Sequence, residues 1–151
     1  MSKNAGSRRQ AREAAFQILY RMDGQPAELE QWLSDPSRMA RELATHFAHF
    51  LVPEAQREFA AELAAGALRD RQKIDDLIQA SQTEWKLSRM AAVDRNLLRL
   101  AVFELTRFED IPPSVTINEA VELAKQFGEA ESPAFINGVL DQVAREKRPH
   151  S

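Results

Sequence analysis

Apolar residues recur along this chain at the three-to-four-residue spacing that is typical of amphipathic helices. The spacing predicts seven helices, over residues 8–22, 28–33, 36–50, 54–80, 91–108, 117–127 and 132–144. No segment shows the strict alternation of a strand. The pattern therefore predicts an all-α fold, a single-domain helical bundle of about six to seven helices, in which the very apolar helix 91–108 is central.

Capping residues refine the last two helices. The spacing of Thr116 and Glu119 fits a capping box at a helix start. Gly128 is expected to end that helix in a left-handed conformation. Ser132 and Pro133 then fit the N-cap and first position of the final helix. The sequence thus predicts two short helices joined by a tight bend.

Two aromatic residues border this bend and lie outside the apolar stripe of their own helices. Phe127 comes just before the bend and Phe135 just after it. Both rings are expected near the helix–helix corner. Such rings either complete the rim of the core or present a face to a ligand, and the spacing alone leaves both readings open.

The composition is that of an ordinary globular protein, with 151 residues of which 44% are hydrophobic and 28% charged. No apolar run reaches the roughly 18 residues of a membrane span, and no signal-peptide core is present. Without cysteine the chain has no disulfide or thiol nucleophile. We expect a cytoplasmic protein with a flexible basic arm at 1–7, a helical domain at 8–146 and a tail at 147–151.

Charge is unevenly distributed along the chain. The first twelve residues hold Lys3, Arg8, Arg9 and Arg12 and no acid; they carry +4 of a net charge of −3, so the remainder carries −7. Arginines at a helix N-terminus oppose the helix dipole, whereas a phosphate there would meet both guanidinium groups and helix amides. The pattern favours a nucleic-acid contact, although basic termini also occur in proteins that bind none.

The chain lacks the motifs of a reacting centre. We find no glycine-rich phosphate loop, no H-E-x-x-H, no G-x-S-x-G and no cysteine–histidine pair. His46 and His49 lie three residues apart, but the remaining histidine is His150 in the tail, which makes a zinc site a poor interpretation. We predict no enzyme, no metal and no cofactor.

Several runs of this sequence resemble the NusB family of bacterial transcription antitermination factors. They are the arginine-rich opening at 8–13 with A-x-Q-x-L-Y at 15–20, W-x-L-x-R-M at 85–90 with V-D-R-x-L-L-R-L-A at 93–101, INEAVELAKQFG at 117–128 and ESPAFINGVLD at 131–141. Only residues 23–80 lack a distinctive match. The resemblance implies an all-helical protein that binds single-stranded boxA-type RNA of ribosomal RNA operons together with NusE, a ribosomal small-subunit protein, in the transcription elongation complex.

The resemblance also implies roles for individual residues. Those expected to lie at RNA are Lys3, Arg8, Arg9, Arg12, Asn118, Lys125, Phe127, Glu131, Phe135 and Asn137. Tyr20 and Asp94 match positions that face NusE. Gln82 falls where the family has an RNA-contacting tyrosine, so one aromatic ring is missing here. Glu131 would either favour the dipole of the final helix or repel passing phosphates.

Two other interpretations remain. The protein could be a helical protein–protein adaptor that does not bind RNA. That interpretation is compatible with the helical core but does not explain the basic arm. Some RNA cytosine methyltransferases carry a NusB-like domain, and their cofactor-binding domain would form a long extension after it.

Overall fold

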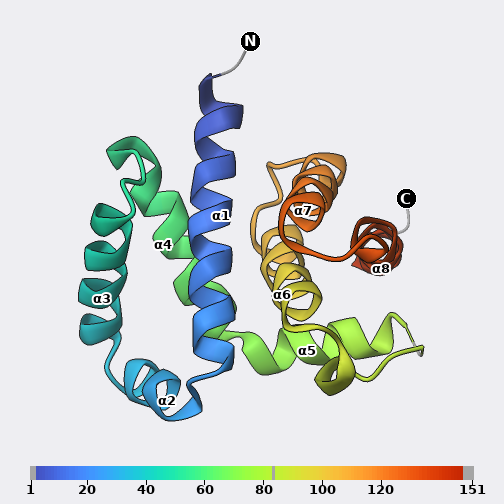
Figure 1. Ribbon diagram of the computed structural model, residues 1–151, viewed down its shortest axis with the longest axis horizontal. Helices are drawn as coiled ribbons and strands as arrows, with labels where there is room; N and C mark the ends of the chain where they lie inside the picture. The colour runs from blue at the N-terminus through green and yellow to red at the C-terminus, as the bar shows by residue number, and fades with distance from the viewer. Residues whose placement is uncertain (1–2, 83, 148–151) are drawn as a thin grey trace. The chain divides into compact units, whose positions relative to one another are not determined.

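The computed structural model describes residues 3–82 and 84–147, with residues 3–7 and 147 described by their backbone alone. In these ranges the chain forms eight α-helices and one short 3₁₀ helix, with no strand (Figure 1). They are α1 (Lys3–Asp23), α2 (Pro26–Ser34), α3 (Pro36–His49), α4 (Glu54–Arg69), α5 (Arg71–Ala80), η1 (Leu87–Arg89), α6 (Ala92–Arg107), α7 (Pro113–Phe127) and α8 (Ser132–Lys147). The all-α prediction is confirmed, with one more helix than the upper expectation. None of the described helices is both long and apolar enough to cross a membrane.

The additional helix comes from the segment predicted as one helix over 54–80. It is two helices, α4 and α5, separated at Asp70, whose carbonyl accepts the first α5 hydrogen bond from the Ile74 amide at 3.0 Å. The apolar stripe does not reveal the break, because Leu63 and Ile74 lie only about 20° apart when projected along one continuous helix. This break also divides the chain into two compact units, Met1–Arg69 and Asp70–Ser151.

The first unit is built from α1 to α4, with α1 packed along α4 and α3 packed on α2 and α4 (Figure 1). Helix α1 begins at Lys3, five residues before the predicted start at 8. The apolar spacing in this helix predicts a core face, which is confirmed because the residues that form it are all buried: Ala11, Ala14, Ala15, Ile18, Leu19 and Met22. Asp35 followed by Pro36 predicts an N-cap and a first helical position, and the structure confirms this: the Asp35 side chain accepts from the Arg38 amide at 3.1 Å.

Helix α3 ends beside a small aromatic cluster. The His46 ring lies 4.4 Å from the Phe50 ring, centroid to centroid, and His49 packs edge-on against the same phenyl group. Burial lowers the pKa of His46, and the positive charges of Arg21 and His49 lower it further. His46 is therefore neutral at pH 7 and acts as a packing group.

The turn after α3 is a Schellman motif, which is a common helix ending. The Val52 amide donates to the Phe47 carbonyl at 3.0 Å, and the Leu51 amide donates to the Ala48 carbonyl at 3.2 Å. Between them Leu51 takes a φ of 58°, a left-handed conformation that costs an L-residue about 1–2 kcal/mol. The Leu51 side chain is 82% exposed, so packing does not offset this strain.

We expect Leu51→Gly to stabilise the protein by about 0.5–1 kcal/mol, since relief of the left-handed strain exceeds the added entropy of glycine in the unfolded chain. Urea unfolding of both proteins measures the difference. Leu51→Ala is the matched control, because it removes the exposed side chain but keeps Cβ, and its free energy of unfolding should stay unchanged. Equal stabilisation by both variants would show that the exposed side chain, rather than the backbone strain, is the cause.

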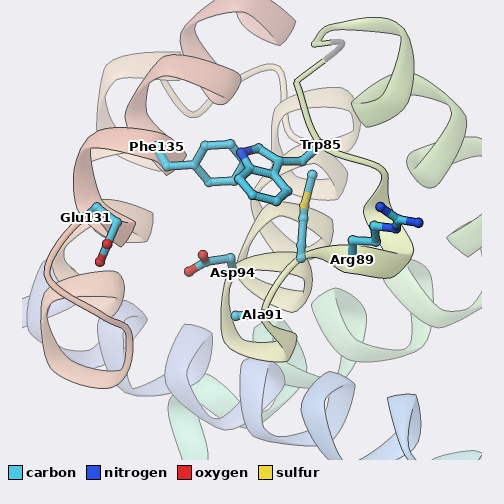
Figure 2. A pocket seen from close by; sticks show the side chains of 7 residues that line it. Trp85, Arg89, Ala91, Asp94, Glu131 and Phe135 are labelled. Carbon is cyan, nitrogen blue, oxygen red and sulfur yellow. The ribbon is translucent and has the colours of Figure 1, made fainter.

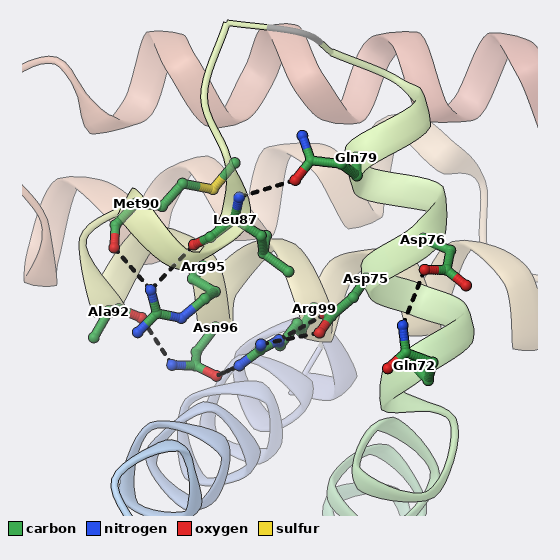
Figure 3. A network of polar contacts seen from close by, with 10 residues as sticks. All are labelled: Gln72, Asp75, Asp76, Gln79, Leu87, Met90, Ala92, Arg95, Asn96 and Arg99. Atoms are coloured by element: carbon green, nitrogen blue, oxygen red, sulfur yellow. Dashed lines mark hydrogen bonds and ion pairs between the residues drawn. The ribbon is translucent and has the colours of Figure 1, made fainter.

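In the second unit, α6 packs against α5, α7 and α8, and every residue from Asn96 to Glu104 is buried. Its predicted central place is confirmed. Two buried polar side chains on α6 bind neighbouring helices: Arg99 forms a bidentate pair with Asp75 of α5 at 2.8 and 3.1 Å, and Glu104 accepts from the Thr116 hydroxyl of α7 at 2.7 Å. Figure 3 shows the first of these pairs. These bonds fix both helices against α6, because a charge buried without a partner costs several kcal/mol.

Candidate nucleic-acid interface

The helix before the bend starts earlier than its sequence predicts. Helix α7 begins at Pro113 with Pro112 as N-cap, and the Val115 amide donates to the Pro112 carbonyl at 2.9 Å. Pro113 fits the first helical position because no amide is needed there. The predicted capping box is therefore wrong: Thr116 and Glu119 lie inside the helix and are buried, and the Thr116 hydroxyl is used by Glu104.

The bend itself is tight for a steric reason. Gly128 has an extended backbone with φ −100° and ψ −170°, so the predicted left-handed ending is wrong. A Cβ on Gly128 would lie 2.7 Å from both Cβ and Oγ of Ser132 and 3.0 Å from the Ala124 carbonyl oxygen. Glycine is needed because the Ser132 side chain and the Ala124 carbonyl oxygen occupy the space of a Cβ, which the sequence does not show.

The N-cap residue of α8 is Glu131, whereas the sequence predicts Ser132 for that position. The Ser132 hydroxyl accepts from the Glu129 amide at 3.0 Å, so it closes the bend instead of capping the next helix. The Glu131 carbonyl accepts the first bond of α8 from the Phe135 amide at 3.1 Å. Glu131 is thus the N-cap residue by hydrogen bonding. The bend is consequently held from both sides, and the residues around it have fixed positions.

A short cavity of about 190 Å³ lies beside this bend (Figure 2). Phe135 and Glu131 from the start of α8 form one wall, and Asp94 lies at the start of α6. The opposite wall is the connector between α5 and α6, from which Trp85 projects toward Phe135 in Figure 2. The structure thus brings together two candidate RNA residues with a candidate partner residue. Trp85 and Arg89, which also line this cavity, had no assigned role, because the exposure of the tryptophan is visible in the structure and not in the sequence.

The other candidates on α7 and α8 lie elsewhere in this unit. Asn118 and Asn137 line a groove of about 450 Å³ between these helices. Asn137 lies about 200° around α8 from Phe135, so the groove and the cavity are on different sides of that helix. Lys125 is exposed and pairs with Glu122 at 3.0 Å. Phe127 at the end of α7 and Phe135 near the start of α8 are both half-buried.

The arginines of α1 differ in their surroundings. Arg9 is exposed, Arg8 is half-buried and Arg12 is only 4% exposed. The guanidinium groups of Arg8 and Arg12 lie 4.9 and 5.5 Å from the centre of the Phe59 ring on α4, which is cation–π geometry. Lys3 lies in the first turn of α1, and its side chain falls outside the described part of the chain. Arg12 therefore has little surface left for a phosphate.

The two candidate partner residues belong to different units. Tyr20 on α1 is exposed, with its ring tilted against Phe16 at 6.1 Å between centroids. Asp94 lies in the first turn of α6, where a carboxylate favours the helix dipole. Its Oδ1 atom is buried and lacks a hydrogen-bond partner among the described residues.

We expect Gly128→Ala to lower the free energy of unfolding by about 1–3 kcal/mol, because the added methyl group displaces a Ser132 side chain that is held by the Glu129 amide. Thermal or urea unfolding measures the loss. Gly138→Ala on α8 is the matched control, since its Cβ meets no atom within 4 Å; a helix interior gains about 0.5–1 kcal/mol from that change. Equal effects of the two substitutions would contradict the steric explanation of the bend.

These features define a class of protein: it is all-helical, and its exposed aromatic and basic side chains are of the kinds that bind nucleic acid. Residues 9–145 match the profile of the NusB family, and the chain belongs to that family. The resemblance found in the sequence is thereby confirmed. Membership and the name that curated members carry also confirm that this chain is not an enzyme.

Curated relatives cover almost the whole chain. The transcription antitermination protein NusB of Desulforapulum autotrophicum is 46% identical over 143 residues, which are 91% of each chain. That of Geobacter sulfurreducens is 44% identical over 142 residues, which cover 92% of this chain and 94% of the relative.

Solved structures agree with the fold. T. maritima NusB is 34% identical with a TM-score of 0.76, covering 94% of this chain and 93% of its own. A structure described as antitermination factors NusB and NusE in complex with dsRNA contains a chain that is 27% identical with a TM-score of 0.76, covering 93% of this chain and 97% of its own.

Proposed function

We propose that this protein is a transcription antitermination factor that binds single-stranded boxA-type RNA of ribosomal RNA operons together with NusE, within the transcription elongation complex. The observation that carries the proposal is the aromatic cavity beside the α7–α8 bend, in a chain that is similar to a solved protein described with NusE and double-stranded RNA. Single strands are favoured because unstacked bases can stack on exposed rings, which Phe127 and Phe135 offer.

The basic start of α1 supplies the electrostatic part of this proposal. Arg9 is exposed, and Arg8 keeps part of its surface, so both can approach phosphates. Lys3, in the same helix, adds a third positive charge. Arg12 contributes indirectly in our proposal, because it packs with Arg8 against Phe59 and so holds the helix face in place.

We expect Arg9→Ala to weaken RNA binding and to flatten its salt dependence by about 0.7 in the log–log slope, the contribution of one single-strand phosphate contact. Fluorescence anisotropy of labelled RNA at several salt concentrations measures the slope. Arg12→Ala is the paired variant: it should leave the slope unchanged and lower the free energy of unfolding by about 1–2 kcal/mol through lost packing and cation–π contact. An unchanged slope in Arg9→Ala would contradict a contact between Arg9 and an RNA phosphate, and would favour an adaptor that does not bind RNA.

The partner surface is proposed to include Tyr20 and Asp94. Tyr20 offers an exposed ring with a hydroxyl, a combination that is frequent at interfaces. Asp94 offers a partly exposed carboxylate in the first turn of α6.

The remaining polar candidates extend the proposed RNA path along α7 and α8. Asn118 and Asn137 flank the groove between these helices and can donate to and accept from base edges. Lys125, near the end of α7, adds a positive charge that Glu122 partly neutralises. These residues would contact nucleotides other than the one in the aromatic cavity.

We expect Glu131→Gln to tighten RNA binding, because the carboxylate at the cavity repels phosphates. The gain should be largest at low salt, where ions screen this repulsion least. The same change should cost about 0.3–1 kcal/mol of stability, since the charge favours the N-terminus of α8. RNA affinity is compared with that of Glu109→Gln, which removes an exposed carboxylate that lines neither the cavity nor the groove. Equal affinity of Glu131→Gln and the unchanged protein at low salt would place the RNA path elsewhere.

A further inference from the structure

Trp85 is a large aromatic side chain that is 52% exposed, in contrast to Trp32, which is fully buried. Its exposure does not come from a loose backbone. Gln82 accepts from the Trp85 amide at 2.9 Å and donates to the Trp85 carbonyl at 2.6 Å. Gln79 donates to the same carbonyl at 3.1 Å. Gln79 in the last turn of α5 and Gln82, two residues after that helix, thus hold the backbone of Trp85 at both its amide and its carbonyl.

The connector after Trp85 is held as firmly. The Leu87 amide donates to Gln79 at 2.9 Å, and Arg95 of α6 donates to the carbonyls of Leu87 and Met90 at 3.1 and 2.8 Å (Figure 3). Leu87 and Met90 are themselves buried. The segment is therefore rigid although it is irregular, and the indole is presented at a defined place.

That place is the cavity beside the α7–α8 bend. Trp85 and Phe135 extend toward one another from opposite walls, with Asp94 and Glu131 along one side (Figure 2). The volume of about 190 Å³ is below the roughly 300–1,000 Å³ of sites for drug-sized ligands, so it suits one flat ring system. The carboxylates repel phosphate, while the exposed Arg89 at the cavity attracts it. A nucleotide would therefore enter with its base, leaving its phosphate toward Arg89.

We propose that Trp85 is a base-stacking residue of the RNA site and that Gln82 is its positioning residue. The inference rests on the proposed RNA binding and deepens it. Gln82 has no ring of its own, but its two hydrogen bonds hold the backbone of Trp85, whose ring lines the cavity together with Phe135. The aromatic platform that seemed to be missing at position 82 is supplied three residues later.

We expect Trp85→Ala to weaken binding of a boxA-like single strand by about 5- to 150-fold, which corresponds to the 1–3 kcal/mol of one stacked base. Trp85→Phe keeps a π face and should retain most of the affinity. Anisotropy of the labelled strand, with NusE present and absent, gives these values. Circular dichroism of each variant shows whether its helices are retained.

Intrinsic fluorescence tests the stacking itself in the unmodified protein. The chain has two tryptophans, and Trp32 is fully buried, so RNA should quench the emission of Trp85 alone. Trp85→Phe should abolish the quenching while the labelled strand still binds. Quenching that persists in Trp85→Phe would assign the signal to Trp32 and overturn the inference, even if Trp85→Ala does not fold.

A double-mutant cycle tests the role of Gln82. Gln82→Ala should weaken RNA binding in the unmodified protein, because the indole loses two backbone anchors, and should have no further effect in Trp85→Ala. A merely structural glutamine would cost the same affinity in both backgrounds, which would overturn its positioning role.

The outcomes separate this inference from the function on which it rests. If the unmodified protein binds no RNA with or without NusE, the proposed function fails and the stacking role fails with it. If RNA binds and Trp85→Ala binds it equally well, only the stacking role is overturned. If Trp85→Ala weakens NusE binding and leaves RNA binding unchanged, the cavity is a protein-binding surface and the inference is wrong.

Discussion

The second unit depends on polar side chains that are buried along α6. A helix buried from Asn96 to Glu104 cannot leave a charge unpaired, because the cost of an uncompensated charge is several kcal/mol. Arg99 therefore requires Asp75. Glu104 accepts a hydrogen bond from the Thr116 hydroxyl, and these two contacts hold α5 and α7 against α6. Hydrophobic contacts are less directional. These hydrogen bonds give the packing its specific geometry.

Polar side chains of α6 also hold the segment that forms one wall of the candidate site. Arg95, one turn before Arg99, binds two carbonyls of the irregular connector. Gln79 in α5 and Gln82 just after α5 bind the same segment. The start of α8 is fixed on the other side by the bend at Gly128. Two aromatic rings are thus presented by rigid elements. Stacking is favoured by such preorganisation, since little conformational entropy is lost on binding.

Much of this structure was predictable from residue spacing. The all-α class, the core face of α1, the cap at Asp35 and the central place of α6 follow from apolar periodicity and local capping chemistry, which act over a few residues. The break at Asp70 was not predictable, because the apolar stripe keeps its phase across it. The start of α7 and the N-cap residue of α8 were misplaced, because Thr116 and Ser132 look like caps and their hydroxyls are used by Glu104 and by the Glu129 amide.

The candidate site was only partly predictable. The sequence indicated Phe135 and Glu131 near a bend, and the structure places them at one cavity with Asp94. The sequence did not indicate Trp85, because its position depends on glutamines whose hydrogen bonds leave no spacing signal. Nor did it distinguish the buried Arg12 from the exposed Arg9, since helix periodicity does not show that Phe59 covers one of them.

The central claim is joint recognition of RNA by this protein and NusE, and the most direct measurement is a binding cycle. Affinity for a boxA-like single strand and for a scrambled strand is measured with and without NusE at one salt concentration. The account predicts that NusE tightens binding of the boxA-like strand more than that of the scrambled strand, and that this RNA tightens NusE binding by the same factor, as linkage requires. Equal affinity for the two strands, unchanged by NusE, would contradict it.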